Sequence, residues 1–435
     1  SGLDIDLKSI SSIYMDRQLM IENVRITDPQ IHIIREKKAP EESFSLLTGN
    51  LYNEISDYLK VLSIDIFAIE NGDLAHSPSE LSLGNIDFYV ENLLIDSASR
   101  PDQKFYSESI ELEIHNQSFK LSDSIHQVSF DRFHLSTADS VLTFENLVVK
   151  PITIFHGTFD DHDNRLLYDI AIPKLRLKGV DYFSAYHNNT LEMEELAIID
   201  SHIFLEEKTQ DKENDETKKS NSLLQQLNEV FDRMKIGKIR FINTNLDLKT
   251  DDDYKHNYQH VQSKRADIVL YNFFLDSTNY RFDQRKKYFD DVDIIIKDYS
   301  SYLPDSIHRV KFDLLQLSSF DSSLVFKNFN ISNNGDGGPS DMYLSIDVPL
   351  ISLKGMNYLD ILIGQKLQIS EMRLKKPNVI FENPQRKSAQ KDFSPDSLYL
   401  LIQKHFKIVR VKKLLVDQGA FSINKQISFG QADLL

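Results

Sequence analysis

The stretch SFKLSDSIHQVSFDRFHLSTADSVLTFENLVVK, residues 118–150, decides how the rest of the sequence is interpreted, because a second version of it occupies residues 300–330. Both versions contain Asp-Ser-Ile-His, then alternating apolar residues, then an Asp-Ser pair and a Phe-x-Asn triplet. The spacing is the same throughout, and Asp123 recurs 182 residues later as Asp305. Self-similarity at a fixed spacing is typical of repeat proteins rather than of a single closed domain.

A second pattern occurs three times and has an apolar residue at every one of its six positions. In each version the apolar residues lie two apart, change phase once and resume after a short turn, which predicts a strand, a bulge or bend, and a partner strand. The turns are Asp28-Pro29, Asp200-Ser201 and Lys376-Pro377. The three versions are Leu19, Ile21, Val24, Ile26, Ile31 and Ile33; Leu191, Met193, Leu196, Ile198, Ile203 and Leu205; and Leu367, Ile369, Met372, Leu374, Val379 and Phe381.

A polar spacer and then a segment with helical periodicity follow each version, so we expect one amphipathic helix per repeat. The helical positions are Leu47, Leu51, Ile55 and Leu59; Leu224, Leu227, Phe231 and Met234; and Leu398, Leu401, Ile402 and Phe406. Alternating apolar residues then return around Asn71-Gly72, Asn243-Thr244 and Gln418-Gly419. Because Asn-Gly favours two-residue turns, this part predicts a hairpin.

The repeat is about 175 residues long, and we expect it to run as residues 1–167 (partial at its start), 168–342 (complete) and 343–435 (truncated). The predicted fold is mainly β: an elongated, twisted antiparallel sheet curled into a groove, with one helix per repeat. One helix of about 15 residues is about 22 Å long and covers only four or five strands. The remaining apolar surface needs another cover, which is either a second layer of sheet or an apolar ligand in an open trough.

Composition excludes several classes of function. The chain has 435 residues, of which 41% are hydrophobic, and a formal net charge of −16, which argues against nucleic acid as a partner. It has no cysteine, so disulfides, thiolate metal sites and cysteine nucleophiles are excluded. No apolar run is long enough to span a membrane. Since it begins with Ser-Gly and stops within a pattern, we expect a piece of a longer protein.

The long strand-rich repeat, the paired apolar strands such as residues 19–26 and the Asp-Ser…Phe-x-Asn-Leu segment at residues 139–147 resemble the AsmA-like proteins of the Gram-negative envelope, the TamB and YhdP group. These are similar in architecture to the eukaryotic bridge-like lipid transfer proteins. The resemblance implies a periplasmic segment of a protein anchored in the inner membrane outside this sequence. It further implies a β-groove that conducts phospholipid acyl chains between the inner and outer membranes, contributes to outer-membrane biogenesis and uses no cofactor.

The lining of such a groove would come from apolar positions in the repeated strands. The candidates are Ile31, Ile33, Phe67, Ile69, Phe144, Leu196, Ile198, Ile203, Leu205, Ile239, Phe241, Phe326, Val379, Phe381, Leu414 and Val416. The same alternation serves a side chain that packs on protein and one that packs on an acyl chain, so both interpretations stay open at each position.

Catalytic and metal-binding interpretations are weaker. Asp-Ser-Ile-His contains the residue types of a hydrolase triad, but no Gly-x-Ser-x-Gly elbow accompanies it, and a hairpin turn explains it better. The cluster of His156 and residues 160–163 is expected to be an exposed loop rather than a metal site, and residues 250–253 a solvated acidic loop rather than a calcium loop. We expect no enzyme, no catalytic residue and no metal.

Two other functions stay open. A structural or adhesive β-sandwich would bind other envelope proteins through its edges or faces. A glycan hydrolase would require paired carboxylates in one cleft, and no pair is distinguished among the 66 acidic residues.

Overall fold

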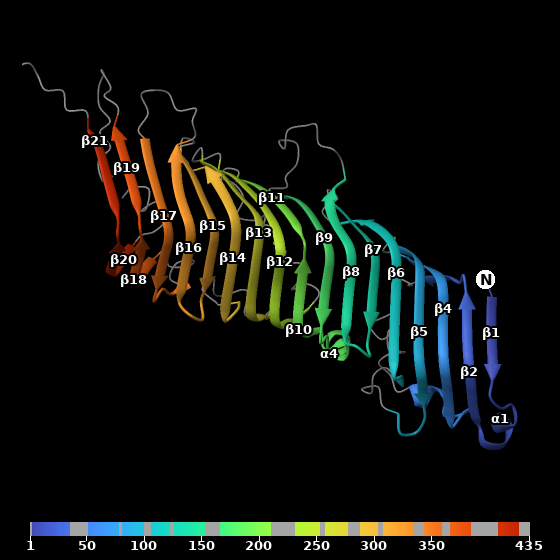
Figure 1. Ribbon diagram of the computed structural model, residues 1–435. Coiled ribbons are helices and arrows are strands. Elements are labelled where there is room, and N and C mark those ends of the chain that lie inside the picture. Colours follow the sequence, from blue (N-terminus) through green and yellow to red (C-terminus); the bar gives the residue numbers. More distant parts are fainter. Residues whose placement is uncertain are drawn as a thin grey trace, which may run out of the picture.

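The structure is a computed structural model, and its strands form one mixed sheet of 21 strands (Figure 1). Three short helices accompany the sheet: α1 (Ser11–Asp16), α3 (Leu51–Ile55) and α4 (Tyr182–His187). The prediction of a mainly β chain is confirmed. The structure describes residues 2–34, 51–77, 81–99, 106–121, 126–152, 166–209, 231–252, 257–276, 288–302, 308–333, 343–358, 366–383 and 408–425.

The strands follow one another across the sheet nearly in chain order. They are β1 (Gly2–Leu7), β2 (Gln18–Thr27), β3 (Gln30–Ile34), β4 (Val61–Ser77), β5 (Leu81–Ile95), β6 (Ser109–Lys120), β7 (His126–Ser136), β8 (Val141–Pro151), β9 (Leu166–Lys178), β10 (Thr190–Ile199), β11 (His202–Thr209), β12 (Arg233–Asp252), β13 (Asn257–Asp276), β14 (Asp291–Tyr302), β15 (His308–Ser318), β16 (Ser323–Asn333), β17 (Tyr343–Lys354), β18 (Lys366–Lys375), β19 (Asn378–Asn383), β20 (Ile408–Asp417) and β21 (Ala420–Lys425).

The expectation of an antiparallel sheet is correct for most neighbours and wrong at three places. β2 and β3 both pair in parallel with β4, β10 and β11 with β12, and β18 and β19 with β20 and β21. At each place the connection is long, as between β3 and β4, where it comprises residues 35–60. A connection of that length lets the chain return to the starting end of the sheet and add the next strand in the same direction.

The predicted partner strands and hairpins are also wrong, because these segments lie end to end. β2 and β3 both lie against β4, one after the other, so β3 continues β2 and does not pair with it. Asn71-Gly72 lies inside β4 and Asn243-Thr244 inside β12, each at a shift of register. A β-bulge needs a left-handed residue as much as a tight turn does, so the same sequence signal serves both.

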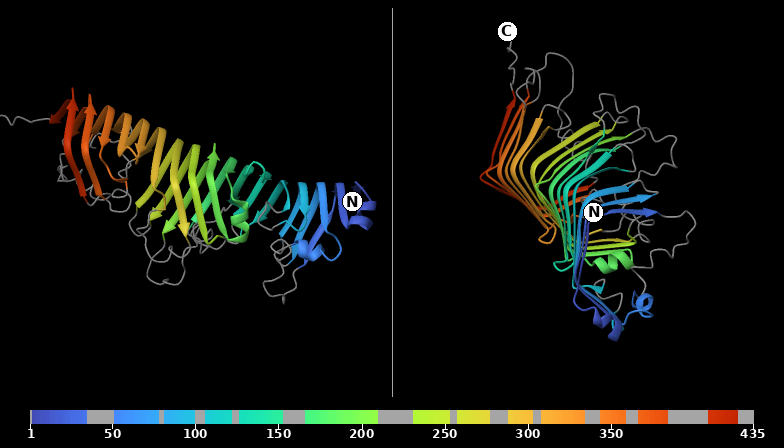
Figure 2. Two further views of the ribbon diagram at one scale, coloured as in Figure 1. Left: turned by 90° about the horizontal axis from the view of Figure 1, so that it is seen from below. Right: turned by 90° about the vertical axis from the view of Figure 1, so that its right-hand side faces the viewer.

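These bulges form a line that crosses the sheet, which we call the crease. Its members are non-glycine residues with φ between 49° and 55°, mostly Asn and Asp, the types that tolerate this conformation best. A bulge bends its strand, and Figure 2 shows strands bent about such a line, which gives the sheet a concave and a convex side. The crease comprises Asp28, Asn71, Asn116, Asn146, Asp200, Asn243, Asp298, Asn328, Lys376 and Gln418.

Hydrogen bonds between neighbouring strands hold the crease residues. The amide nitrogen Nδ2 of Asn71 donates to Asp28 Oδ1 at 2.6 Å, and that of Asn243 donates to Asp200 Oδ1 at 2.7 Å. Asn146, from the Phe-x-Asn triplet, donates in the same way to an aspartate on β7. The repeated asparagines therefore bend the strands and tie each bend to the next.

Side chains at the crease show which face of the sheet is concave. All the crease residues are exposed, whereas their neighbours on the other face, such as Thr244 and Ala266, are fully buried. Apolar rings also touch across the bend: Phe144 lies on one side of it and Phe130 on the other, with centroids 5.3 Å apart. Because the inside of a bend brings side chains together, the face that carries the apolar residues is the concave one.

The described residues form a single layer, not two sheets packed face to face as the sandwich alternative requires. All the described strands belong to one hydrogen-bonded sheet, so no described strand lies in a second sheet over either face.

Predictions for the helices and the Asp-Ser-Ile-His turns can be followed only in part. α3 falls where the first helix was expected, while Leu47, residues 224–230 and residues 398–406 lie outside the described residues. The end of the second predicted helix is wrong, since Phe231 is not helical and Met234 belongs to β12, where it pairs with Leu191 and Leu275. His126 begins β7 and His308 begins β15, so each motif leads into the second strand of an antiparallel pair. The other residues of both motifs lie outside the described part.

Candidate functional site

The concave side carries an unbroken row of apolar side chains that extends from β5 to β20. Residues opposite each other in a ladder point to the same face, so the strand register defines this row. Every position in it is apolar. The central row consists of Ile86, Ile114, Phe133, Phe144, Leu175, Ile198, Phe241, Ile268, Ile294, Leu317, Leu324, Leu353, Met372 and Leu414.

The candidate lining residues whose side chains are described all lie on this concave face. Phe144, Ile198, Phe241 and Leu414 belong to the central row itself. Other candidates on the same side of the crease as the central row lie in rows adjacent to it. Candidates on the opposite side of the crease form the second wall of the bend. The side chains of Ile33 and Phe381 lie outside the described part. The first group is Phe67, Ile69, Leu196, Ile239, Phe326 and Val416, and the second is Ile31, Ile203, Leu205 and Val379.

Several residues of the row were not among the candidates, including Leu175, Ile268 and Ile294. They lie in strands for which only two versions of the sequence exist, so the three-way match could not select them. Alternation within the strand, as in Lys-Leu-Arg-Leu-Lys at residues 174–178, was the signal that could have found Leu175.

Protein covers part of the concave face at the starting ends of β10 and β12. Val180, Met193, Met234 and Leu275 form a buried cluster there, and Tyr182 of α4 packs against it. Burial raises the pKa of the Tyr182 hydroxyl above its ordinary value. At the head of α4, Asp181 accepts hydrogen bonds from the backbone and hydroxyl of Ser184, and the backbone bond holds the pKa of Asp181 below its ordinary range.

A second buried cluster at β17 and β18 contains Val348, Ile351, Leu353, Met356 and Ile369. Most other apolar side chains of the face are half-buried in the middle of the sheet and exposed at its two ends. Ile198 and Phe241 are flanked by neighbouring strands and are half-buried. At the end strands, Ile5 is 50% exposed and Leu414 is 56% exposed. In the middle, therefore, flanking strands supply the burial, and in the described part no second sheet lies over the row.

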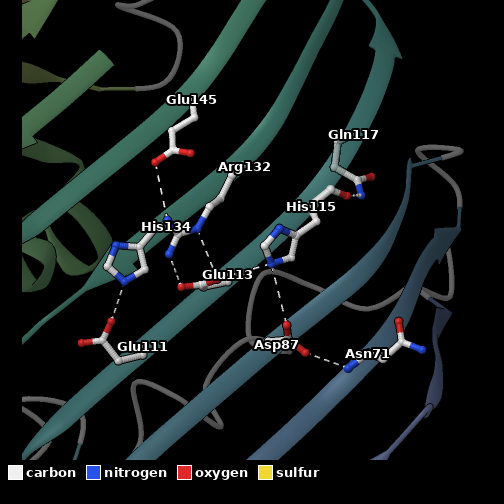
Figure 3. A network of polar contacts seen from close by, with 9 residues as sticks. All are labelled: Asn71, Asp87, Glu111, Glu113, His115, Gln117, Arg132, His134 and Glu145. Carbon is white, nitrogen blue, oxygen red and sulfur yellow. Dashed lines mark hydrogen bonds and ion pairs between the residues drawn. The ribbon is translucent and has the colours of Figure 1, made fainter. Parts of the chain in front are cut away.

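The convex face is charged and carries ladders of ion pairs, one of which Figure 3 shows. Arg132 on β7 contacts Glu113 on β6 at 2.5 Å and Glu145 on β8 at 3.5 Å. His134 contacts Glu111 at 2.8 Å. These residues alternate with the apolar ones along the same strands, so the sheet has one wet face and one apolar face.

The Arg132–Glu113 pair predicts a dependence of stability on pH. The hydrogen bond from Arg132 holds the pKa of Glu113 below its ordinary value. The stabilisation is therefore present above about pH 4.3, the value in an unfolded chain, and is lost as pH falls through the lower pKa of the folded protein. Since the pair is partly exposed, we expect Glu113→Gln to reduce the loss of stability between pH 5 and pH 3 by up to about 1 kcal/mol.

Urea unfolding at a series of pH values measures this effect. Glu145→Gln serves as the control, because that carboxylate makes only the longer contact to Arg132. The same acid loss in wild type and Glu113→Gln would contradict the assignment.

The other chemical candidates from the sequence gain no support. The described residues contain no group of three or more His, Cys, Asp or Glu placed to hold a metal, and the His156 cluster lies outside them. The prediction of a loop at residues 250–253 is wrong for its first part, since β12 continues to Asp252 as a partner of β13. Within the same described ranges, no helix is long and apolar enough to cross a membrane.

Comparison with known proteins adds no identification: no model of a protein family matches the sequence, and no curated protein matches it.

Proposed function

We propose that this chain is a segment of a lipid-conducting β-groove, in which phospholipid acyl chains lie along the concave apolar face while head groups stay in water. The observation that carries the proposal is the unbroken apolar row on the concave side of a one-layer sheet. A soluble protein normally covers such a face with a second layer. An acyl chain is a cover that can move along it.

The dimensions of the row suit this role. Four of the 21 strands continue a neighbour end to end, which leaves 17 successive positions across the sheet. At about 4.8 Å for each step, the sheet is about 77 Å across, and the central row from β5 to β20 is about 62 Å long. One leaflet of a bilayer has a hydrocarbon thickness of about 15 Å, so several acyl chains fit along the row in succession.

The energetics require no chemistry beyond burial. Each CH₂ group that leaves water for an apolar surface gains about 0.8 kcal/mol, and successive positions of the row are chemically alike. A lipid therefore exchanges one set of aliphatic and phenyl contacts for another as it advances. No catalytic residue takes part.

We further propose that the groove is built from three repeats, as the sequence pattern suggests. A residue with a left-handed backbone conformation stands at the equivalent position of each repeat, namely Asp28, Asp200 and Lys376. At each of these positions one strand ends and a second strand continues it, and the first strand pairs in parallel with the next strand of the sheet. Together with the resemblance to AsmA-like proteins, this supports a periplasmic location, an anchor in the inner membrane supplied by another part of the protein, and a role in outer-membrane biogenesis with envelope proteins as possible partners.

Native mass spectrometry of gently purified protein tests the proposal. We expect the 50.4-kDa chain to carry additional mass in steps that correspond to phospholipids, which extraction and lipid analysis then identify. Stripping with detergent followed by incubation with phosphatidylethanolamine vesicles should restore the added mass. A strictly lipid-free mass before and after incubation would count against the proposal.

A further inference from the structure

Two short segments, residues 179–182 and 355–358, follow β9 and β17, and we call them the straps. Each strap opens on a glycine whose φ is 66° or 68°, a left-handed conformation that favours glycine. The N–H group of this glycine donates to the carbonyl oxygen of Ser140 in the first strap and of Ser322 in the second, at 2.8 Å in both. These serines belong to the repeated Asp-Ser pair, which therefore holds each strap against the end of the sheet.

The straps carry apolar side chains onto the concave face. Val180 belongs to the buried cluster at the starting ends of β10 and β12, and Met356 belongs to the cluster at β17 and β18. The second strap also reaches back across the sheet, since the hydroxyl of Tyr358 donates to the backbone carbonyl of Asp290, just before β14, at 2.8 Å. Both straps are thus packed on the face at the same end of the strands, which we call the strap end.

Burial on the concave face decreases from the strap end toward the opposite end of the strands, which we call the far end. The second position of the threefold pattern lies on the strap side of the crease, and its residues Ile21, Met193 and Ile369 are only 8%, 7% and 4% exposed. The fifth position lies beyond the crease, where Ile203 and Val379 are half-buried in the second and third versions. Protein therefore fills the strap side of the face in all three versions of the pattern.

The length of strand between the central row and the far end suits an acyl chain. On β8, Phe144 of the central row and Pro151 at the far end are seven residues apart (151 − 144 = 7), which is about 23 Å along the strand. The hydrocarbon of one bilayer leaflet is about 15 Å thick. An acyl chain that enters from the far end can therefore reach the central row, whereas one that enters from the strap end has to displace packed side chains.

A phospholipid on this face needs one end of the strands at which its head group meets water, because burying a charged phosphate without a partner is strongly unfavourable. We propose that phospholipids occupy the concave face in one orientation, with head groups along the far end and the ends of the acyl chains toward the straps. This inference rests on the proposed lipid-conducting function and adds the direction in which each lipid faces. A lipid in this orientation advances from strand to strand without turning over.

Nitroxide quenching of a fluorescent probe tests the orientation, and the chain has no cysteine to interfere with labelling. Leu142 and Val149 form a matched pair, since both lie on β8, are half-buried and point to the concave face on either side of Phe144. Bimane is attached to Leu142→Cys or to Val149→Cys in the full chain, which is then loaded with phosphatidylcholine. The lipid carries a nitroxide either on its head group or near the end of an acyl chain.

The head-group nitroxide should quench the probe at position 149 several-fold more than the probe at position 142, and the acyl-chain nitroxide should reverse this order. The equivalent pair on β16, Leu324 and Ile331, should give the same result and provides an independent measurement, with circular dichroism as the check on the fold of each labelled variant. Quenching by the head-group nitroxide that is equal at both positions, or stronger at position 142, would overturn the orientation while lipid binding stands. No quenching at any position by either lipid would contradict the lipid function itself, and the orientation with it.

Discussion

Replacement of Ile198 by aspartate is expected to remove lipid from the middle of the concave face. Ile198 lies in the central row between Leu175 and Phe241. A carboxylate there stays hydrated, because burying it beside an acyl chain without a partner costs several kcal/mol. Since each 1.4 kcal/mol is a factor of ten, lipid captured by a photo-crosslinking residue at Leu175 should fall by about 100-fold.

The neighbouring residue supplies a matched control. Ile199 is also half-buried but points to the convex face, where Lys174 and Ile242 are its ladder partners. Ile199→Asp should therefore leave lipid capture at Leu175 nearly unchanged. Circular dichroism of both variants separates loss of lipid from loss of fold. Equal lipid capture in the two variants, with both folded, would show that the concave face does not hold the lipid.

Replacement of Asn243 by valine is expected to destabilise the sheet strongly, because the crease requires a left-handed residue there. Asn243 has φ of 53°, its side chain donates to Asp200 at 2.7 Å, and its backbone N–H donates to Asp267 at 2.7 Å. The left-handed conformation costs an ordinary residue about 1–2 kcal/mol, more for a β-branched one, and the lost side-chain hydrogen bond adds about 1 kcal/mol. We expect Asn243→Val to lower the free energy of unfolding by about 2–4 kcal/mol.

Glycine at the same position separates the two causes. Asn243→Gly keeps the conformation without strain and loses only the side-chain hydrogen bond, so it should cost about 1 kcal/mol. The shift in the urea midpoint of each variant measures the difference. The same order is expected at Asn71, which donates to Asp28 in the same way. A valine variant no less stable than the glycine variant would mean that the bend does not depend on this residue.

The sequence was informative about strands and faces and less so about how strands connect. Alternation placed Ile198, Phe241 and Phe326 on one face, and the ladder register agrees. The three-way match also picked out the positions of Asn71 and Asn243, but their left-handed conformation serves a bulge inside a strand as well as a turn between strands. Apolar residues alternate with a period of two on both sides of a bulge and also on both sides of a turn. Only the pairing of the strands therefore distinguishes a bulge from a turn.

The parallel strand pairs and the ion pairs of the polar face could not be predicted from sequence alternation, for a related reason. β2 has the same alternation whether β4 lies parallel or antiparallel to it, and only the length of the connection carries a signal. Arg132 and Glu113 appeared as ordinary charges on a wet face, since nothing in a sequence shows which residues of neighbouring strands lie opposite each other. The register of a 21-stranded sheet supplies that information.

Photo-crosslinking at one adjacent pair of residues tests the central claim most directly. Phe326 on β16 lies on the concave face, opposite Leu315 and Ile351, whereas Lys327 is exposed and points the other way. With a benzophenone amino acid at one position or the other, purified protein loaded with phospholipid is irradiated and its mass measured. The lipid account predicts a protein–phospholipid adduct from position 326 and little from position 327. Equal adducts at both positions, or none at position 326, would contradict it.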